Sequence, residues 1–144
     1  MFKRRKILVV DDDRLTREIM VRTLSKAGYD VLYAEDGLTA VEMARAEKPD
    51  LVLTDGLLPK MHGFLVCATI KAFEAPPKVV VITGVYTKPN YKYEVKHQHR
   101  ADEILFKPIA PSALLEMVEK QLAGLPIANV SEETLARPEY AETA

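Results

Sequence analysis

Five short apolar runs recur along the chain and constrain its fold more than any other feature of the sequence. They cover residues 7–10, 31–34, 51–54, 79–83 and 104–106. The third and fourth runs are apolar at successive positions, without the alternation of a strand that has one face in water. Uninterrupted short runs of this kind are typical of parallel strands that are buried on both faces. We therefore predict five strands of a parallel sheet.

The segments between these runs have the periodicity of amphipathic helices. The predicted core-facing positions are Ile19, Met20, Thr23, Leu24 and Ala27 in the first segment, Leu38, Val41 and Ala44 in the second, and Leu114, Leu115, Val118 and Leu122 in the last. A further helix is expected over residues 63–73, Gly28 is the expected end of the first helix, and Pro111 suits the first turn of the last. Five strand–helix units predict an α/β fold, a doubly wound sheet with helices on both faces.

Length and composition indicate one folded domain with a short appendage. The chain has 144 residues, of which 48% are hydrophobic, enough for one compact core. The helical and strand patterns end near Ala123, and the remainder contains two prolines and several acidic residues. We expect a domain over residues 1–123 and a poorly ordered tail or linker over residues 124–144.

Charge and hydropathy exclude several classes of protein. With 20 basic and 21 acidic residues the net charge is −1, so charge favours neither nucleic acid nor a membrane surface as a partner. The apolar run after the basic start is too short for a signal peptide, and no stretch is long enough to span a bilayer. Cys67 is the single cysteine, which excludes an internal disulfide and suits a reducing compartment. A cytoplasmic protein is expected.

Polar residues stand at the ends of four predicted strands. Asp11, Asp12 and Asp13 follow the first run, and Asp55, Thr83 and Lys107 stand at the ends of the third, fourth and fifth. Ligands of open parallel sheets bind at this edge, so these side chains should converge. Two carboxylates about 4 Å apart repel by about 4 kcal/mol at an effective dielectric constant near 20, which favours a bound hard cation. Mg²⁺ is expected because it combines a few carboxylates with water and phosphate oxygens.

The same cluster favours phosphoryl transfer. Asp55 stands alone at the end of a central strand and is the expected nucleophile, forming an acyl phosphate. Asp11 and Asp12 would hold the metal, which neutralises charge on the transferring group. Lys107 and Thr83 would contact the phosphoryl oxygens as a cation and as a hydrogen-bond donor. Asp13 is interpreted as a helix N-terminal charge and not as a third metal ligand.

Four motifs in this order resemble the receiver domains of response regulators. They are residues 6–13, ending in three aspartates, residues 55–63, from Asp55 to Gly63, residues 82–84 around Thr83, and residues 106–108 around Lys107. The resemblance covers residues 6–123 and implies a flavodoxin-like sheet of order 2-1-3-4-5 with five helices. It also implies phosphorylation on Asp55, an acidic pair at Asp11 and Asp12, and Mg²⁺ coordination by the backbone carbonyl of Leu57.

The resemblance further implies switch roles for Thr83 and Lys107, a cis peptide between Lys107 and Pro108, and a histidine kinase or histidine phosphotransfer protein as phosphodonor. The chain departs from the family at Ile104, a switch position that usually carries an aromatic residue. Because isoleucine is stiff and has no hydroxyl, we expect signalling through movement of Thr83 and residues 84–90. The face made by the fourth helix, fifth strand and fifth helix would bind an output protein or a second copy.

Residues 85–100 are unusual for a fourth helix, because they are basic and rich in tyrosine. We expect an acidic protein partner to dock on Lys92, Lys96 and Arg100, since surface charge steers and selects partners. A direct nucleic-acid contact is not expected, because a solvated helix face explains the same pattern.

Three other functions remain open. A degenerate receiver would bind partners without phosphorylation. A metal-dependent phosphohydrolase would be expected to have a general acid two residues after its nucleophile, where this chain has Leu57, so turnover of outside substrates is not expected. A flavin-binding protein would need a phosphate-binding loop after the first strand, where Asp11, Asp12 and Asp13 would repel the phosphate.

Overall fold

The structure is a computed structural model that describes residues 4–84 and 100–123. The expected fourth helix within residues 85–100 falls almost entirely outside these residues, and so does the expected tail over residues 124–144. None of the described helices is long and apolar enough to cross a membrane.

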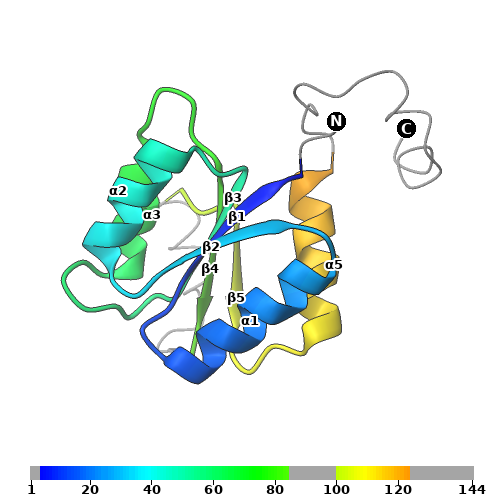
Figure 1. The fold of residues 1–144 in the computed structure, drawn as a ribbon. Coiled ribbons are helices and arrows are strands. Elements are labelled where there is room, and N and C mark those ends of the chain that lie inside the picture. The colour runs from blue at the N-terminus through cyan, green and yellow to red at the C-terminus, as the bar shows by residue number, and fades with distance from the viewer. Residues whose placement is uncertain (1–3, 85–99, 124–144) are drawn as a thin grey trace, which may run out of the picture.

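Five parallel strands form one sheet, as predicted. They are β1 (Lys6–Val10), β2 (Asp30–Ala34), β3 (Leu51–Thr54), β4 (Lys78–Thr83) and β5 (Glu103–Phe106), in the order β2-β1-β3-β4-β5 (Figure 1). All except β3 begin one residue before the predicted run, because pairing extends to polar residues such as Lys6, which pairs with Asp30. Backbone hydrogen bonds between strands can extend to polar residues outside the core, and a search for apolar runs does not find those residues.

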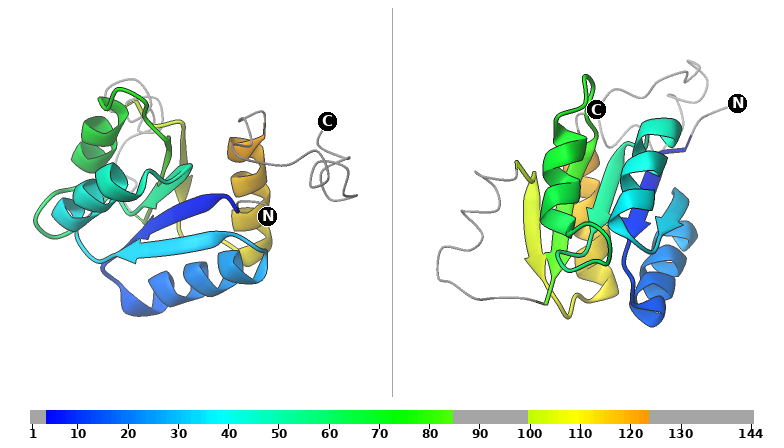
Figure 2. Two further views of the ribbon diagram at one scale, coloured as in Figure 1. Left: turned by 45° about the horizontal axis from the view of Figure 1, so that its top comes forward. Right: turned by 90° about the vertical axis from the view of Figure 1, so that its left-hand side faces the viewer.

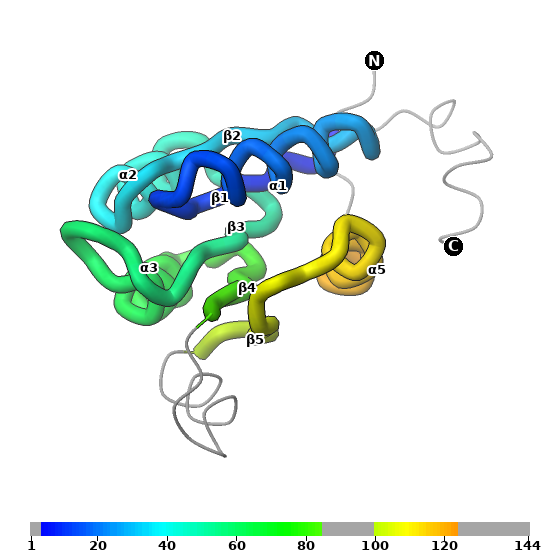
Figure 3. Tube along the Cα trace, turned by 90° about the horizontal axis from the view of Figure 1, so that it is seen from below, coloured from blue at the N-terminus to red at the C-terminus, as the bar shows by residue number. Residues whose placement is uncertain are grey.

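Within residues 4–84 and 100–123, four helices pack against the sheet in two pairs. They are α1 (Arg14–Lys26), α2 (Gly37–Glu47), α3 (Gly63–Lys71) and α5 (Pro111–Leu122). Figures 2 and 3 show α2 and α3 on one side of the sheet and α1 and α5 on the other. Each side has its own apolar cluster: Leu8 and Val52 belong to the first, and Ile7 and Leu53 to the second. The helix expected over residues 63–73 ends at Lys71.

Three of the predicted core positions are wrong. Ile19 and Leu38 are 49% and 46% exposed, and Ala27 is also exposed. The inner face of α1 consists of Arg17, Met20 and Leu24, which follow one another at spacings of three and four residues. That stripe turns Ile19 outward, because adjacent helical residues point about 100° apart. Helix α1 therefore has more apolar residues than positions on its buried face, and some of them are exposed.

The helix boundaries are set by local hydrogen bonds. Asp13 is the N-cap of α1 and accepts from the Thr16 amide, and Asp36 accepts in the same way from Thr39 ahead of α2. These bonds lower the pKa of both carboxyls, Asp13 chiefly through the Thr16 hydroxyl and Asp36 chiefly through the Thr39 amide. Gly28 follows α1 with φ of 99°, a conformation that favours glycine. The interpretation of Asp13 as a helix-terminal charge is confirmed.

Candidate functional site

Three carboxylates meet at the edge where the strands end. Asp11, Asp12 and Asp55 each offer one oxygen, and these oxygens all lie within 4.8 Å of one another. Asp11 is fully buried after β1, Asp12 beside it is exposed, and the Asp55 side chain after β3 is 12% exposed. Sheet pairing causes this arrangement: the Asp55 amide donates to the Val10 carbonyl at 2.9 Å, so β1 and β3 end side by side.

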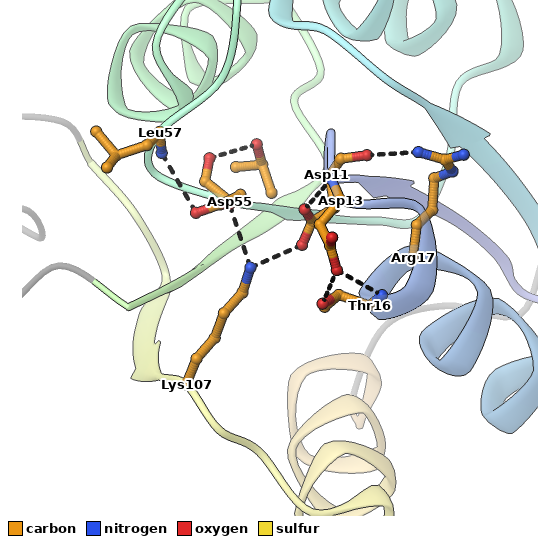
Figure 4. Close-up of polar contacts among 8 residues, drawn as sticks. Asp11, Asp13, Thr16, Arg17, Asp55, Leu57 and Lys107 are labelled. Carbon is orange, nitrogen blue, oxygen red and sulfur yellow. Dashed lines mark hydrogen bonds and ion pairs between the residues drawn. The ribbon is translucent and has the colours of Figure 1, made fainter.

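Lys107 joins two of these carboxylates. Its ammonium nitrogen lies 2.8 Å from Asp11 Oδ2 and 3.2 Å from Asp55 Oδ2 (Figure 4). The residue follows β5, and its amide donates to the Thr83 carbonyl at 2.9 Å. Burial lowers the pKa of Lys107, but hydrogen bonding and charge attraction, first from Asp11 and then from Asp55, outweigh burial and raise it overall. The Lys107–Pro108 peptide is cis, as the resemblance implied.

Thr83 is fully buried at the end of β4. It lies next to Gly56, the residue after Asp55: a Cβ placed on Gly56 would be 3.0 Å from the Thr83 hydroxyl and 2.8 Å from the Phe64 ring. Phe64 belongs to α3 and was not recognised from the sequence, where an aromatic near the start of a helix has no distinguishing pattern. Thr83 is therefore placed beside the loop that carries Asp55.

The loop after Asp55 is held against the start of α3. The Gly63 amide donates to the Gly56 carbonyl at 3.1 Å, and a Cβ on Gly63 would lie 1.6 Å from the Asp55 carbonyl oxygen. Only glycine permits this approach. The Leu57 amide is 3.3 Å from Asp55 Oδ1, and the Leu57 side chain is 49% exposed. The backbone amide of Leu57 thus lies next to the Asp55 carboxylate, and the role of the Leu57 carbonyl as a metal ligand stays a prediction.

Three further residues named in the sequence analysis are not members of the carboxylate cluster: Ile104, Cys67 and Arg100. Ile104 is 1% exposed and packs in the apolar cluster on the α2–α3 side of the sheet. His62 is exposed just before α3. Cys67 is buried in α3, and burial raises the pKa of its thiol to about 12. Of the expected docking residues, Lys92 and Lys96 lie outside the described residues, and Arg100 is exposed.

The donor set fits a small hard cation. Three carboxylates within 4.8 Å supply negatively charged oxygen ligands, which Mg²⁺ prefers. Lys107 offsets part of this charge through Asp11 and Asp55. The exposed side of the cluster, at Asp12, leaves room for ligands from solvent or from a phosphoryl group.

Known proteins resemble this chain in sequence and in structure. The family model of the response regulator receiver domain matches residues 7–119. The chain is 32% identical over 129 residues to the alkaline phosphatase synthesis transcriptional regulatory protein PhoP of Bacillus subtilis (strain 168), covering 90% of this chain and 53% of that protein. It is 36% identical over 111 residues to the response regulator MprA of Mycobacterium ulcerans (strain Agy99), covering 76% of this chain and 47% of that one. The chain thus spans about half the length of both relatives.

Two solved structures have the same fold. The receiver domain of the putative response regulator NarL from Mycobacterium tuberculosis superposes with a TM-score of 0.76 at 31% identity, covering 85% of this chain and 98% of that one. The chemotaxis response regulator CheY4 of Vibrio cholerae has a TM-score of 0.76 at 27% identity, covering 83% and 100%. Together with the family model and the sheet order, these matches show that the chain belongs to the response regulator receiver domain family.

Proposed function

We propose that this domain is a phosphorylation switch in which Asp55 accepts a phosphoryl group from the phosphohistidine of a histidine kinase or a histidine phosphotransfer protein. The observation that carries the proposal is the position of Asp55, which lies within 4.8 Å of the Asp11 and Asp12 carboxylates and 3.2 Å from the Lys107 ammonium. The wider context is two-component signalling, to which the family belongs. The domain would work in the cytoplasm, where such donors are found.

In the proposed reaction an Asp55 carboxylate oxygen forms a bond to phosphorus while the phosphorus–nitrogen bond of the donor histidine breaks. The electron pair of that bond stays with the imidazole, which ends as neutral histidine because its other ring nitrogen already carries a proton or because the ring takes one from solvent. Asp11, Asp12, Asp55 and the Leu57 carbonyl would hold Mg²⁺, which when bound neutralises charge on the phosphoryl oxygens. The product is an acyl phosphate on Asp55.

Lys107 and Thr83 would respond to the added group. The Lys107 ammonium already bonds the Asp55 carboxylate, so a phosphoryl oxygen on that carboxylate would come within its reach. The Thr83 hydroxyl lies beside Gly56 and would move toward the phosphoryl group. Because Ile104 is buried and has no hydroxyl, we expect the change to reach an output protein through Thr83 and residues 84–90, most of which lie outside the described residues. An acidic output partner, and a homodimer through the face that includes β5 and α5, remain predictions.

The proposal is tested by incubating the protein with acetyl phosphate and Mg²⁺ and measuring its intact mass. The wild type should gain one phosphoryl group, Asp55→Asn should gain none, and Lys107→Ala should keep some labelling but lose the conformational response. Asp13→Asn is the matched control, because Asp13 neighbours the acidic pair but caps α1. Equal labelling of Asp55→Asn would place the acceptor elsewhere. No labelling of the wild type, with partner binding unaffected by beryllofluoride, would instead favour a degenerate receiver.

A further inference from the structure

Arg17 is a buried arginine on the inner face of α1, six residues after Asp11. It is 7% exposed, whereas Arg14 and Arg22 on the same helix are exposed. Burying a guanidinium is unfavourable unless its donors are bonded. Arg17 shares the buried face of α1 with Met20 and Leu24, so its place there must be explained by what its side chain contacts.

The guanidinium connects the ends of two strands. Nη1 donates to the Asp11 carbonyl at 2.9 Å in a buried hydrogen bond, and Nη2 donates to Glu35 Oε1 at 3.2 Å (Figure 4 shows the Asp11 bond). The carbon at the centre of the guanidinium lies 5.2 Å from the centre of the Tyr33 ring. Asp11 follows β1, and Tyr33 and Glu35 stand at the end of β2. Arg17 thus ties α1 to the edge of the sheet that carries the carboxylates.

Asp11 is bonded at every polar group. Its amide donates to the Ala34 carbonyl at 3.2 Å, and its carbonyl accepts from Arg17. Its carboxylate accepts from the Asp13 amide at 2.9 Å and from Lys107 at 2.8 Å. Groups other than Arg17 therefore hold the carboxylate and the amide of Asp11. Arg17 is the side chain that holds the Asp11 carbonyl.

The Asp11 carbonyl belongs to the peptide that joins Asp11 to Asp12. Because a peptide is planar, a bond that fixes this oxygen also fixes the direction in which the chain enters Asp12. Asp12 is the exposed member of the carboxylate cluster. The orientation of its carboxylate therefore depends on the peptide plane that Arg17 holds.

We propose that Arg17 is a positioning residue for metal binding, which acts by fixing the Asp11–Asp12 peptide so that the Asp12 carboxylate faces Asp11 and Asp55. This rests on the proposed Mg²⁺ site. Groups that orient metal ligands typically change metal affinity by tenfold or more when they are removed. Lysine cannot replace arginine here, because its single ammonium lacks the planar fork that reaches two acceptors in different elements.

Arg17 affects Mg²⁺ affinity in two opposite ways, so the direction of the change in a variant distinguishes them. As a nearby positive charge Arg17 opposes cation binding, so removing the charge alone would strengthen it. As a positioning group it supports binding, so losing the fork would weaken it. We expect about tenfold weaker Mg²⁺ binding in both Arg17→Lys, which keeps the charge, and Arg17→Gln, which does not.

The experiment titrates the full chain with Mg²⁺ and follows the backbone amide chemical shifts near Asp12 by NMR, which gives the dissociation constant without phosphorylation. Arg22→Gln is the matched control, since it removes an exposed arginine of the same helix and should leave the constant unchanged. Tyr33→Leu removes the ring beside the guanidinium without changing charge. Because Tyr33 is 54% exposed, this variant should fold, and we expect it to bind Mg²⁺ about twofold more weakly.

Labelling by acetyl phosphate supplies a second readout. At saturating Mg²⁺ the Arg17 variants should recover the wild-type rate, because the defect is in affinity and not in the chemistry of Asp55. Wild-type Mg²⁺ affinity in Arg17→Lys, or tighter binding in Arg17→Gln, would overturn the proposal. If neither Arg17 variant folds, unchanged affinity in Tyr33→Leu would overturn it. If the wild type binds no Mg²⁺, both this proposal and the proposed function are refuted. If the wild type and the Arg17 variants bind Mg²⁺ equally well, only the role of Arg17 is refuted.

Discussion

Replacing Asp12 with asparagine should stabilise the metal-free protein. Asp11 and Asp55 each accept a hydrogen bond from Lys107, whereas Asp12 adds a third negative charge at the exposed side of the cluster. Asparagine has nearly the same shape as aspartate and removes that charge. The unfolded chain lacks the repulsion, so the substitution should raise the free energy of unfolding.

The size of the effect follows from the spacing of the oxygens. At the 4.8 Å limit, two carboxylates repel by about 3.5 kcal/mol at an effective dielectric constant near 20, and by about 0.9 kcal/mol in bulk water. Asp12 is exposed, so the lower figure is the better guide. Two neighbouring carboxylates repel it and Lys107 cancels roughly one of them, which leaves about 1 kcal/mol. For a domain of this size that corresponds to a rise in Tm of about 4 °C.

The assay is thermal unfolding by circular dichroism in EDTA at low salt, repeated in high salt, where screening should shrink the gain. Asp55→Asn should gain less than Asp12→Asn, because it also loses the ion pair with Lys107. Asp13→Asn is the control, since asparagine caps a helix about as well as aspartate. Added Mg²⁺ should raise the Tm of the wild type but not that of Asp12→Asn. A Tm of Asp12→Asn at or below the wild-type value in EDTA would refute the reasoning.

Four other predictions follow from single contacts. Leu57→Asn should lose its phosphoryl group faster than the wild type, measured by intact mass over time, because an apolar Leu57 cannot orient an attacking water. Gly63→Ala should lower the free energy of unfolding in urea by about 2–3 kcal/mol, because its Cβ would lie 1.6 Å from the Asp55 carbonyl oxygen. Cys67 should resist iodoacetamide at pH 8 until the protein unfolds, because burial raises its thiol pKa to about 12. The pKa of Asp13 is lowered in the folded state, so the ionised carboxylate should stabilise the fold above pH 3.8, and this stabilisation should be lost as the pH falls through the lowered pKa. Asp13→Ala should therefore flatten this part of the curve of unfolding free energy against pH.

The parallel sheet and the edge at which the carboxylates meet follow from sequence patterns alone. Buried parallel strands need apolar side chains on both faces, and such runs are visible without a structure. Once the strands are parallel, their carboxyl ends share one edge, so Asp11, Asp12, Asp55, Thr83 and Lys107 had to lie near one another. The caps at Asp13 and Gly28 were also predictable, because helix ends are decided by bonds within a few residues.

Which side chains contact one another depends on how the folded elements pack. Periodicity gives the direction of an apolar face but not how much of it a neighbouring element covers, so the exposure of Ile19 and Leu38 was not predictable. Arg17 has no local signal, because its acceptors stand at the ends of β1 and β2, which become neighbours only when the strands pair. The close approach of Gly63 to the Asp55 carbonyl likewise depends on how α3 docks beside β3. Local patterns fix each element, whereas contacts between elements distant in the sequence arise from the packing of all of them at once.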